Sequence, residues 1–237
     1  MFFGWLDERR RKRILEHPFP EEWDRILARR VAHVAYLDED ERAHLRQLVQ
    51  VFVEEKSWEG LGGLEMTDEI RVTIAAEACL LILALEHALY KQVESILVYP
   101  KTVVAPPQPQ SFFSVARAPM ATGMPVLGQA MHRGPVVLVW DAVRRGSANA
   151  KDGHNVVIHE FAHKLDMLDG SADGVPPLAD DATYNRWIEV FTREYDAMQR
   201  AHDRGKRTWL GDYALTNGAE FFAVATEHFF ERPRAMQ

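Results

Sequence analysis

Five consecutive residues, HEFAH from His159 to His163, set the strictest requirement on the fold of this chain. On a helix, two histidines four residues apart lie on one face and can reach a single metal ion. Glu160 is about 100° further round such a helix than His159, where it can reach a water molecule on that ion. Zn²⁺ held by two imidazoles and one carboxylate keeps a position open for water. The pattern therefore predicts a helix at a hydrolytic metal centre.

The residues around this motif predict that the helix packs on a core. Apolar side chains recur on the face opposite the two histidines, at Val157, Ile158, Phe161, Leu165 and Leu168. Asp166 lies on the histidine face, one turn beyond His163, where it could accept an imidazole N–H and orient a ligand. The alternative is a surface helix whose His, Glu and Asp side chains are solvated.

Cysteine is too scarce to supply most of the ligands of such a centre. The chain has one cysteine and ten histidines in 237 residues, which excludes an internal disulfide framework and the Cys₂His₂ and Cys₄ zinc sites. Metal ligands must therefore come mainly from His, Asp and Glu. Cys79 stands in the apolar run 78–85 and is predicted to be a buried core thiol.

The third ligand has three candidates. Asp169 stands at the last position of an extended H-E-x-x-H-x-x-G-x-x-H/D pattern, although Asp166 occupies the position of the turn-forming Gly. Glu220 and Glu227 share one face of a predicted apolar helix over 218–230, where a metal would offset the cost of burying a carboxylate. Asn217 and Glu220 also fit a helix-capping pattern, and Glu227 could pair with a His or Arg instead.

Two other histidines carry less weight. His154 is off the ligand face and is expected to serve the start of the helix. His132 precedes the apolar segment Val136–Trp140 and is expected in a loop or at the wall of a cleft. That segment is predicted to be a strand, and it could form the cleft edge that aligns a peptide substrate by β-augmentation.

The rest of the pattern predicts an α+β chain. Helices are expected over 20–56, with a break near Asp38, and over 67–90, with Thr67 or Asp68 as cap. The segment 96–104 is β-rich, and its Pro100 suggests an edge or a bulge. Residues 105–125 contain five prolines and are expected to form a loop or hairpin. We predict one domain over 1–237, with a helical N-terminal part (1–65), a catalytic core (66–237) and a small mixed sheet.

Charge and hydropathy limit the partners. The formal net charge is −7, so no overall basic excess favours nucleic acid. The N-terminal segment does not have the order of a signal peptide, and no apolar run approaches the ~20 residues of a membrane span. A cytoplasmic protein is the expectation. The basic run 9–13 is expected to be a solvated helix face.

Three blocks of sequence resemble a known family. They are GPVVLVWDAV (134–143), DGHNVVIHEFAHKLDMLDG (152–170) and NGAEFFAVATEHFFERP (217–233). They are similar to the Mlc titration factor A family of bacterial zinc peptidases, whose catalytic core resembles the C-terminal protease domain of anthrax lethal factor. The resemblance covers most of the chain, with few matches in the first 60 residues, and the family usually runs further than Gln237.

This resemblance implies a zincin-like fold and a set of roles. His159, His163 and Glu220 would bind one Zn²⁺, and Glu160 would be the catalytic base. Tyr213 has the spacing of a tyrosine that assists catalysis in the toxin domain, seven residues before the third ligand. The expected activity is that of an aminopeptidase on short peptides. The family also implies binding of the transcriptional repressor Mlc, which regulates glucose-uptake genes. The alternatives are a non-catalytic protein that sequesters the repressor and a zinc fold that has lost activity.

Overall fold

The computed structural model describes residues 2–85, 90–101, 103–104, 125–126, 128–130 and 134–236. His132 and, apart from Pro125, the predicted loop or hairpin region 105–125 lie outside the described residues. Among the described helices, none is long and apolar enough to cross a membrane.

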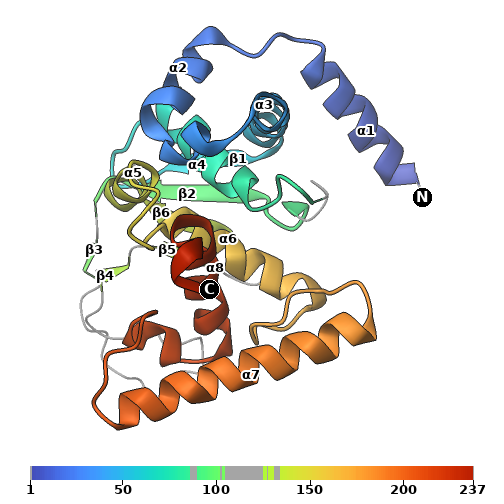
Figure 1. Ribbon diagram of the computed structural model, residues 1–237. Helices are drawn as coiled ribbons and strands as arrows, with labels where there is room; N and C mark the ends of the chain where they lie inside the picture. Colours follow the sequence, from blue (N-terminus) through green and yellow to red (C-terminus); the bar gives the residue numbers. More distant parts are fainter. Residues whose placement is uncertain are drawn as a thin grey trace, which may run out of the picture.

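A small mixed sheet lies near the middle of the view in Figure 1. Its strand order is β1-β2-β6-β5, with β1, β2 and β6 parallel and β5 antiparallel to β6. The short strands β3 and β4 form a separate antiparallel pair. The bounds are Ser57–Gly60 for β1, Ser95–Tyr99 for β2, Val103–Val104 for β3, Pro125–Val126 for β4, Gly128–Ala130 for β5 and Val136–Val139 for β6.

The sheet order corrects two sequence predictions. Strand β6 is paired on both sides, so the segment Val136–Trp140 is not a cleft edge, and Trp140 already begins the next helix. Strand β2 is also interior, and Pro100 follows its last residue, Tyr99, where no ladder N–H is needed. The continuous apolar run VVLV of β6 is typical of such an enclosed strand. The sheet edge beside β6 is β5.

The N-terminal part of the chain is largely helical, and it includes the helices predicted over 20–56. Asp38 caps α3 in a capping box with Glu41, which confirms the break near this residue. Thr67 caps α4, but this helix ends ten residues before the predicted Tyr90. The Tyr90 hydroxyl donates to the carbonyl of Ala78 at 2.9 Å, so the chain returns onto the helix end. The elements are α1 (Phe2–Leu15), α2 (Glu21–Arg30), the 3₁₀ turn η1 (Ala32–Tyr36), α3 (Glu39–Glu55) and α4 (Asp68–Leu80).

The C-terminal half supplies the helices that carry the predicted site. Helix α6 packs against α8, and the long helix α7 crosses the molecule beside them (Figure 1). The elements are α5 (Trp140–Ser147), α6 (Val156–Asp166), η3 (Met167–Asp169), α7 (Asp181–Asp203), η4 (Asp212–Leu215), α8 (Gly218–Glu231) and η5 (Pro233–Met236).

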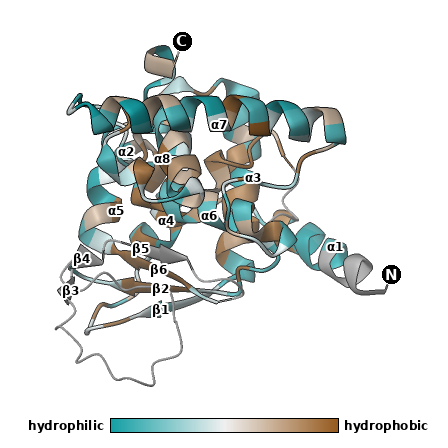
Figure 2. Ribbon diagram, turned by 90° about the horizontal axis from the view of Figure 1, so that it is seen from below, coloured by the Kyte–Doolittle hydropathy of each residue, from teal (hydrophilic) through white to brown (hydrophobic). Residues whose placement is uncertain are grey.

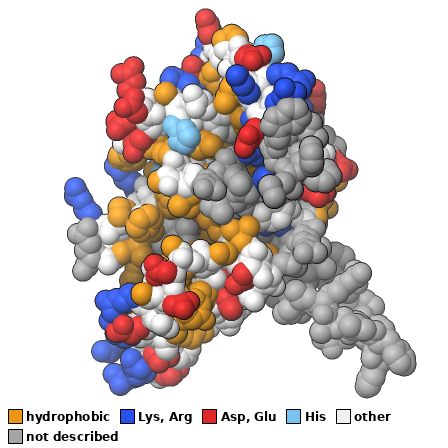
Figure 3. Space-filling view, turned by 90° about the vertical axis from the view of Figure 1, so that its right-hand side faces the viewer, with side chains coloured by type: hydrophobic (Ala, Val, Ile, Leu, Met, Phe, Trp, Pro, Cys, Tyr) orange, Lys and Arg blue, Asp and Glu red, His pale blue; other side chains and the backbone are white. Residues whose placement is uncertain are grey.

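Most helices lie on one side of the sheet, and the main core is between them and the strands (Figure 2). This core joins the apolar faces of α2, α3 and α4 to β2, β6 and α6. Cys79 is a buried, free thiol within it, as predicted. The face in Figure 3 carries hydrophobic side chains over its middle and charges of both signs around them, so the net negative charge does not dominate this face. Helices with a small sheet fit the predicted α+β class.

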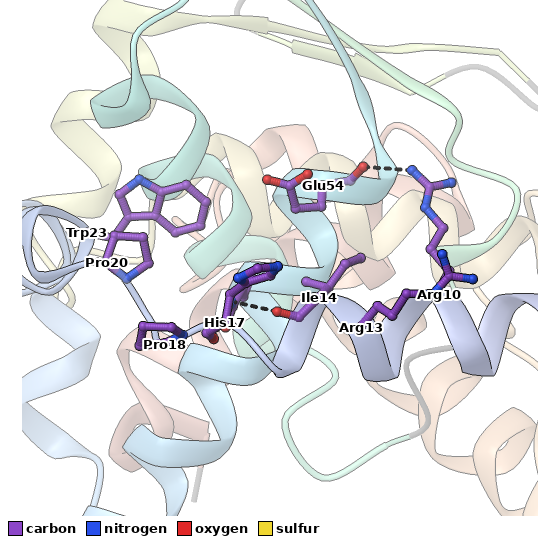
Figure 4. A pocket seen from close by; sticks show the side chains of 9 residues that line it. Arg10, Arg13, Ile14, His17, Pro18, Pro20, Trp23 and Glu54 are labelled. Atoms are coloured by element: carbon purple, nitrogen blue, oxygen red, sulfur yellow. Dashed lines mark hydrogen bonds between the residues drawn. The ribbon is translucent and has the colours of Figure 1, made fainter.

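The basic run 9–13 lies on α1 and is mostly exposed, as predicted for a solvated helix face, but two of its arginines also contact α3. Arg11 pairs with Glu55 of α3 at 2.6 Å, and Arg10 donates to the carbonyl of Glu54 at 3.0 Å. These contacts hold α1 against α3. A cleft of about 450 Å³ lies between α1, the following loop and α2, with Arg13 and Trp23 among its lining residues (Figure 4).

Candidate metal centre

Helix α6 begins at a well-defined cap. The Asn155 side-chain oxygen accepts the N–H groups of Val157 and Ile158, each at 3.2 Å. The apolar face predicted from the sequence is buried, and the Phe161 ring packs edge-on against Tyr90 at a centroid distance of 5.0 Å. Because that face is fixed in the core, the opposite face of α6, with both histidines, is turned toward α8.

Three side chains converge where α6 faces α8. The Nε2 atoms of His159 and His163 are 3.2 Å apart. A carboxylate oxygen of Glu220 lies 3.1 Å from the first of these atoms and 3.5 Å from the second. A tetrahedral Zn²⁺ with bonds of about 2.0–2.1 Å places its ligand atoms about 3.3–3.4 Å apart. The triangle of donor atoms therefore fits such an ion. Among the described residues, these three form the one group of three or more His, Cys, Asp or Glu side chains whose donor atoms are close enough to share a metal.

Glu220 takes part in both arrangements that the sequence left as alternatives, the capping pattern of α8 and the group of candidate metal ligands. Asn217 caps α8 by accepting the Glu220 N–H at 2.9 Å, as the spacing predicted. The carboxylate of Glu220 does not complete a capping box and is directed to the two histidines instead. The cap therefore fixes the backbone of Glu220 and leaves its side chain for the metal centre.

The other two candidates for third ligand are not in this group. Asp169 is exposed, and its carboxylate accepts the N–H of Ser171. Glu227 lies on the far side of an imidazole, where one oxygen is 2.8 Å from Nδ1 of His159 and the other accepts the N–H of Asn155 at 2.6 Å. Such a contact fixes the imidazole tautomer, so that Nε2 faces the metal position.

The prediction for Asp166 is wrong. Both of its carboxylate oxygens accept the N–H of Gly174, at 2.9 and 3.0 Å, and no imidazole N–H reaches it among the described residues. Helix periodicity correctly placed Asp166 on the histidine face of α6. However, Asp166 is the last residue of the helix, and its side chain contacts the loop before α7 instead of an imidazole. Glu227, from the neighbouring helix, takes the orienting contact with His159 instead.

Glu160 is buried beside the three donor atoms. Its side chain is 5 % exposed, and Oε2 has no hydrogen-bond partner in the described part of the chain. Burial raises the pKa of Glu160 to about 7, although the neighbouring His159 and His163 lower it. A carboxylate with a pKa near neutrality can both take up and release a proton.

Tyr213 is a partly exposed residue beside His159. It is in η4, its side chain is 51 % exposed, and its ring centroid is 5.9 Å from that of His159. Partial burial and the Glu220 carboxylate raise the pKa of this phenol, so the hydroxyl keeps its proton. The sequence could assign this residue only by resemblance, because a single tyrosine at a short 3₁₀ turn carries no spacing signal.

A proton and a metal ion compete for the same atoms. Burial alone would lower the pKa of His159, but its contacts with Glu220 and Glu227 raise this pKa to about 10. Burial likewise opposes ionisation of Glu220, yet the two histidines hold its pKa well below its usual value. The same carboxylates that favour protonation of His159 would favour a metal ion on its Nε2 atom, so metal affinity should depend on pH.

Two buried glutamates at the start of α6 were missed from the sequence. Glu77 of α4 accepts from the side-chain amide of Asn155 at 3.0 Å. Glu231 of α8 accepts the N–H groups of Gly153 and His154, at 2.8 and 3.0 Å. His154 thus lies at the helix start, as predicted. A lone Glu within the apolar run of α4 was the available signal for Glu77.

Removing the Asn155 side chain should destabilise the fold. Asn155→Ala deletes both cap hydrogen bonds of α6 and leaves the buried Glu77 carboxylate without that amide donor. We expect a loss of about 2–4 kcal/mol in the free energy of unfolding, measured by urea denaturation. Asp38→Ala, which removes an exposed cap, should cost about 1 kcal/mol. Equal losses in the two variants would contradict the buried role of Asn155.

Comparison with known proteins identifies the family. The model of the family described as glucose-regulated metallo-peptidase M90 matches residues 5–237. The chain belongs to this family. The match makes it a metallopeptidase-like protein, and the group His159, His163 and Glu220 is a possible site for the metal that the family name implies.

Individual relatives agree with this assignment. An uncharacterized protein of Synechocystis sp. is 36 % identical, over 98 % of this chain and 84 % of that protein. Mlc titration factor A of Serratia proteamaculans is 32 % identical over 91 % of this chain and 80 % of its own length. The protein of that name in Escherichia fergusonii is 33 % identical, over 89 % and 78 %. The resemblance to the Mlc titration factor A family is thereby confirmed.

Proposed function

We propose that this M90 member is a zinc-dependent peptidase with a zincin-like catalytic core. The observation that carries the proposal is the triangle of donor atoms from His159, His163 and Glu220, whose sides of 3.1–3.5 Å suit one tetrahedral ion. A purely structural zinc site does not need a further buried carboxylate, yet Glu160 is buried beside this triangle. That pairing favours hydrolysis over a structural role.

The side chains divide the chemistry between them. When bound, zinc would supply a Lewis acid that polarises a carbonyl and lowers the pKa of water. Glu160 takes a proton from the attacking water and delivers it to the leaving amine. The Tyr213 hydroxyl donates a hydrogen bond to the oxygen that gains negative charge. Glu227 holds the His159 ring through Nδ1 while this happens. The proposed substrates are short peptides, cleaved in the manner of an aminopeptidase.

Metal removal tests the proposal. Treatment with a chelator should abolish cleavage of a pool of short peptides, and one equivalent of Zn²⁺ per chain should restore it. Metal content is measured by elemental analysis and cleavage by mass spectrometry, which also shows whether residues leave from the amino end. Full cleavage by protein verified to be metal-free would overturn the metallopeptidase assignment.

A second candidate function is binding of the repressor Mlc. The names of relatives at 32–33 % identity, Mlc titration factor A, favour it. Sequestering a repressor needs a complementary surface and no chemistry, so the two functions can coexist in one chain.

A pull-down separates the two functions. We expect immobilised Mlc to retain the Glu160→Gln variant as well as it retains the unmodified protein, because this substitution is buried and leaves the surface unchanged. Bound protein is quantified against a column without Mlc. If the unmodified protein is not retained, the repressor function does not apply to this chain, whatever the outcome of the peptide assay.

A further inference from the structure

Helices α6 and α8 run in opposite directions and are joined at both ends. Near the start of α6, the backbone N–H of Asn155 donates to Glu227, in the second half of α8. Near the end of α6, the joining residue is Asp166, which reaches the start of α8 through a loop. The predicted metal ligands lie between these two connections, so the connections decide how far Glu220 is from the histidines.

The connection at Asp166 is buried and specific. The Asp166 side chain is 0 % exposed, and both oxygens accept the N–H of Gly174. A buried carboxylate is costly unless hydrogen bonds satisfy it, so this contact strongly favours one position of the loop. On the other side of the loop, the Trp187 indole of α7 donates to the carbonyl of Gly174 at 3.0 Å.

The backbone of this loop, at Asp173 and Gly174, packs directly against the backbone of Gly218, the first residue of α8. A Cβ atom added to Gly174, which has φ +88°, would lie 2.4 Å from the carbonyl oxygen of Gly218. A Cβ atom added to Gly218 would lie 2.4 Å from the carbonyl oxygen of Asp173. Both residues are glycines because any side chain would push the loop and the helix apart.

Short stretches of chain separate this contact from the metal ligands. Asp166 follows His163 by three residues on α6, and Gly218 precedes Glu220 by two residues on α8. We propose that Asp166 is a positioning residue, which acts through Gly174 and Gly218 to set the place of Glu220 relative to the two histidines. This inference rests on the proposed metal centre. It gives Asp166 a role that is distinct from orienting an imidazole.

The test compares metal affinity in four variants with that of the unmodified protein. Asp166→Ala removes the acceptor, Asp166→Asn keeps one side-chain carbonyl oxygen, and Gly218→Ala displaces the loop while Asp166 is intact. Glu189→Gln is the control, because Glu189 is exposed on α7, away from this contact, and pairs with Arg186 among the ion pairs of the described residues. Zinc dissociation constants are measured by competition with a chromogenic chelator, and the visible absorption of the Co²⁺-loaded proteins reports ligand geometry.

We expect Asp166→Ala and Gly218→Ala to weaken zinc binding by about tenfold or more, as disturbed outer contacts of metal sites do. Both should also change the Co²⁺ spectrum. Asp166→Asn should lie between them and the unmodified protein, and Glu189→Gln should match the unmodified protein. If Asp166→Ala fails to fold, Asp166→Asn and Gly218→Ala carry the test. Unchanged zinc affinity and Co²⁺ spectrum in the folded variants would overturn the positioning role, even if stability falls. Failure of the unmodified protein to bind zinc would instead overturn the proposed metal centre.

Discussion

Replacing Glu160 by Gln should lower the rate of peptide cleavage by about a hundredfold to ten-thousandfold, the usual contribution of a general base. The amide has nearly the shape of the carboxylate, so the helix should stay intact, but it cannot accept a proton from water. The burial that raises the pKa of Glu160 to about 7 is what makes this residue suited to the role. We therefore expect the loss in kcat, with zinc content and KM nearly unchanged.

The measurement needs zinc content and cleavage on the same preparation. Glu189→Gln is a suitable control, because Glu189 is exposed on α7 and pairs only with Arg186 at the surface among the ion pairs described. It should cleave peptides as the unmodified protein does. A Glu160→Gln protein with a full complement of zinc and full activity would show that Glu160 is not the base. That result would overturn the proposed mechanism but not the proposed metal site.

The features that the sequence predicted well depend on nearby residues. The helix over the HEFAH motif, its buried apolar face and the caps at Asp38, Thr67 and Asn217 follow from spacing within a few residues. Helix periodicity also placed Glu220 and Glu227 on one face of α8. Local patterns of this kind survive folding because the same contacts exist whatever packs around them.

The features that were missed depend on which elements meet in space. The sequence allowed β6 to be a cleft edge, and only its pairing with both β2 and β5 makes it interior. Asp166 was expected to orient a histidine, and only the approach of α8 from the other direction gives that contact to Glu227. Neither pairing has a signature in one sequence, because strand order and helix direction are settled by contacts between residues far apart in the chain.

We expect Glu220, and not Asp169 or Glu227, to be the third metal ligand. Glu220→Gln should lower zinc affinity by more than the about 10–100-fold that outer contacts are worth, because a neutral amide replaces an anionic donor atom. The same change leaves Glu227 as the carboxylate in contact with His159 among the described residues. Peptide cleavage should fall with zinc occupancy and recover in part at high zinc concentration.

Two further variants distinguish a ligand from its neighbours. Asp169→Asn should bind zinc normally, since this side chain is exposed and accepts only from Ser171 among the hydrogen bonds described. Glu227→Gln should have an intermediate effect, because Glu227 contacts His159 through Nδ1, away from the three converging donor atoms. Zinc affinity in all three proteins is measured by chelator competition at one pH, since protons compete with the metal. Normal affinity in Glu220→Gln, together with a large loss in Glu227→Gln, would transfer the third ligand to Glu227 and require α8 to turn when the metal binds.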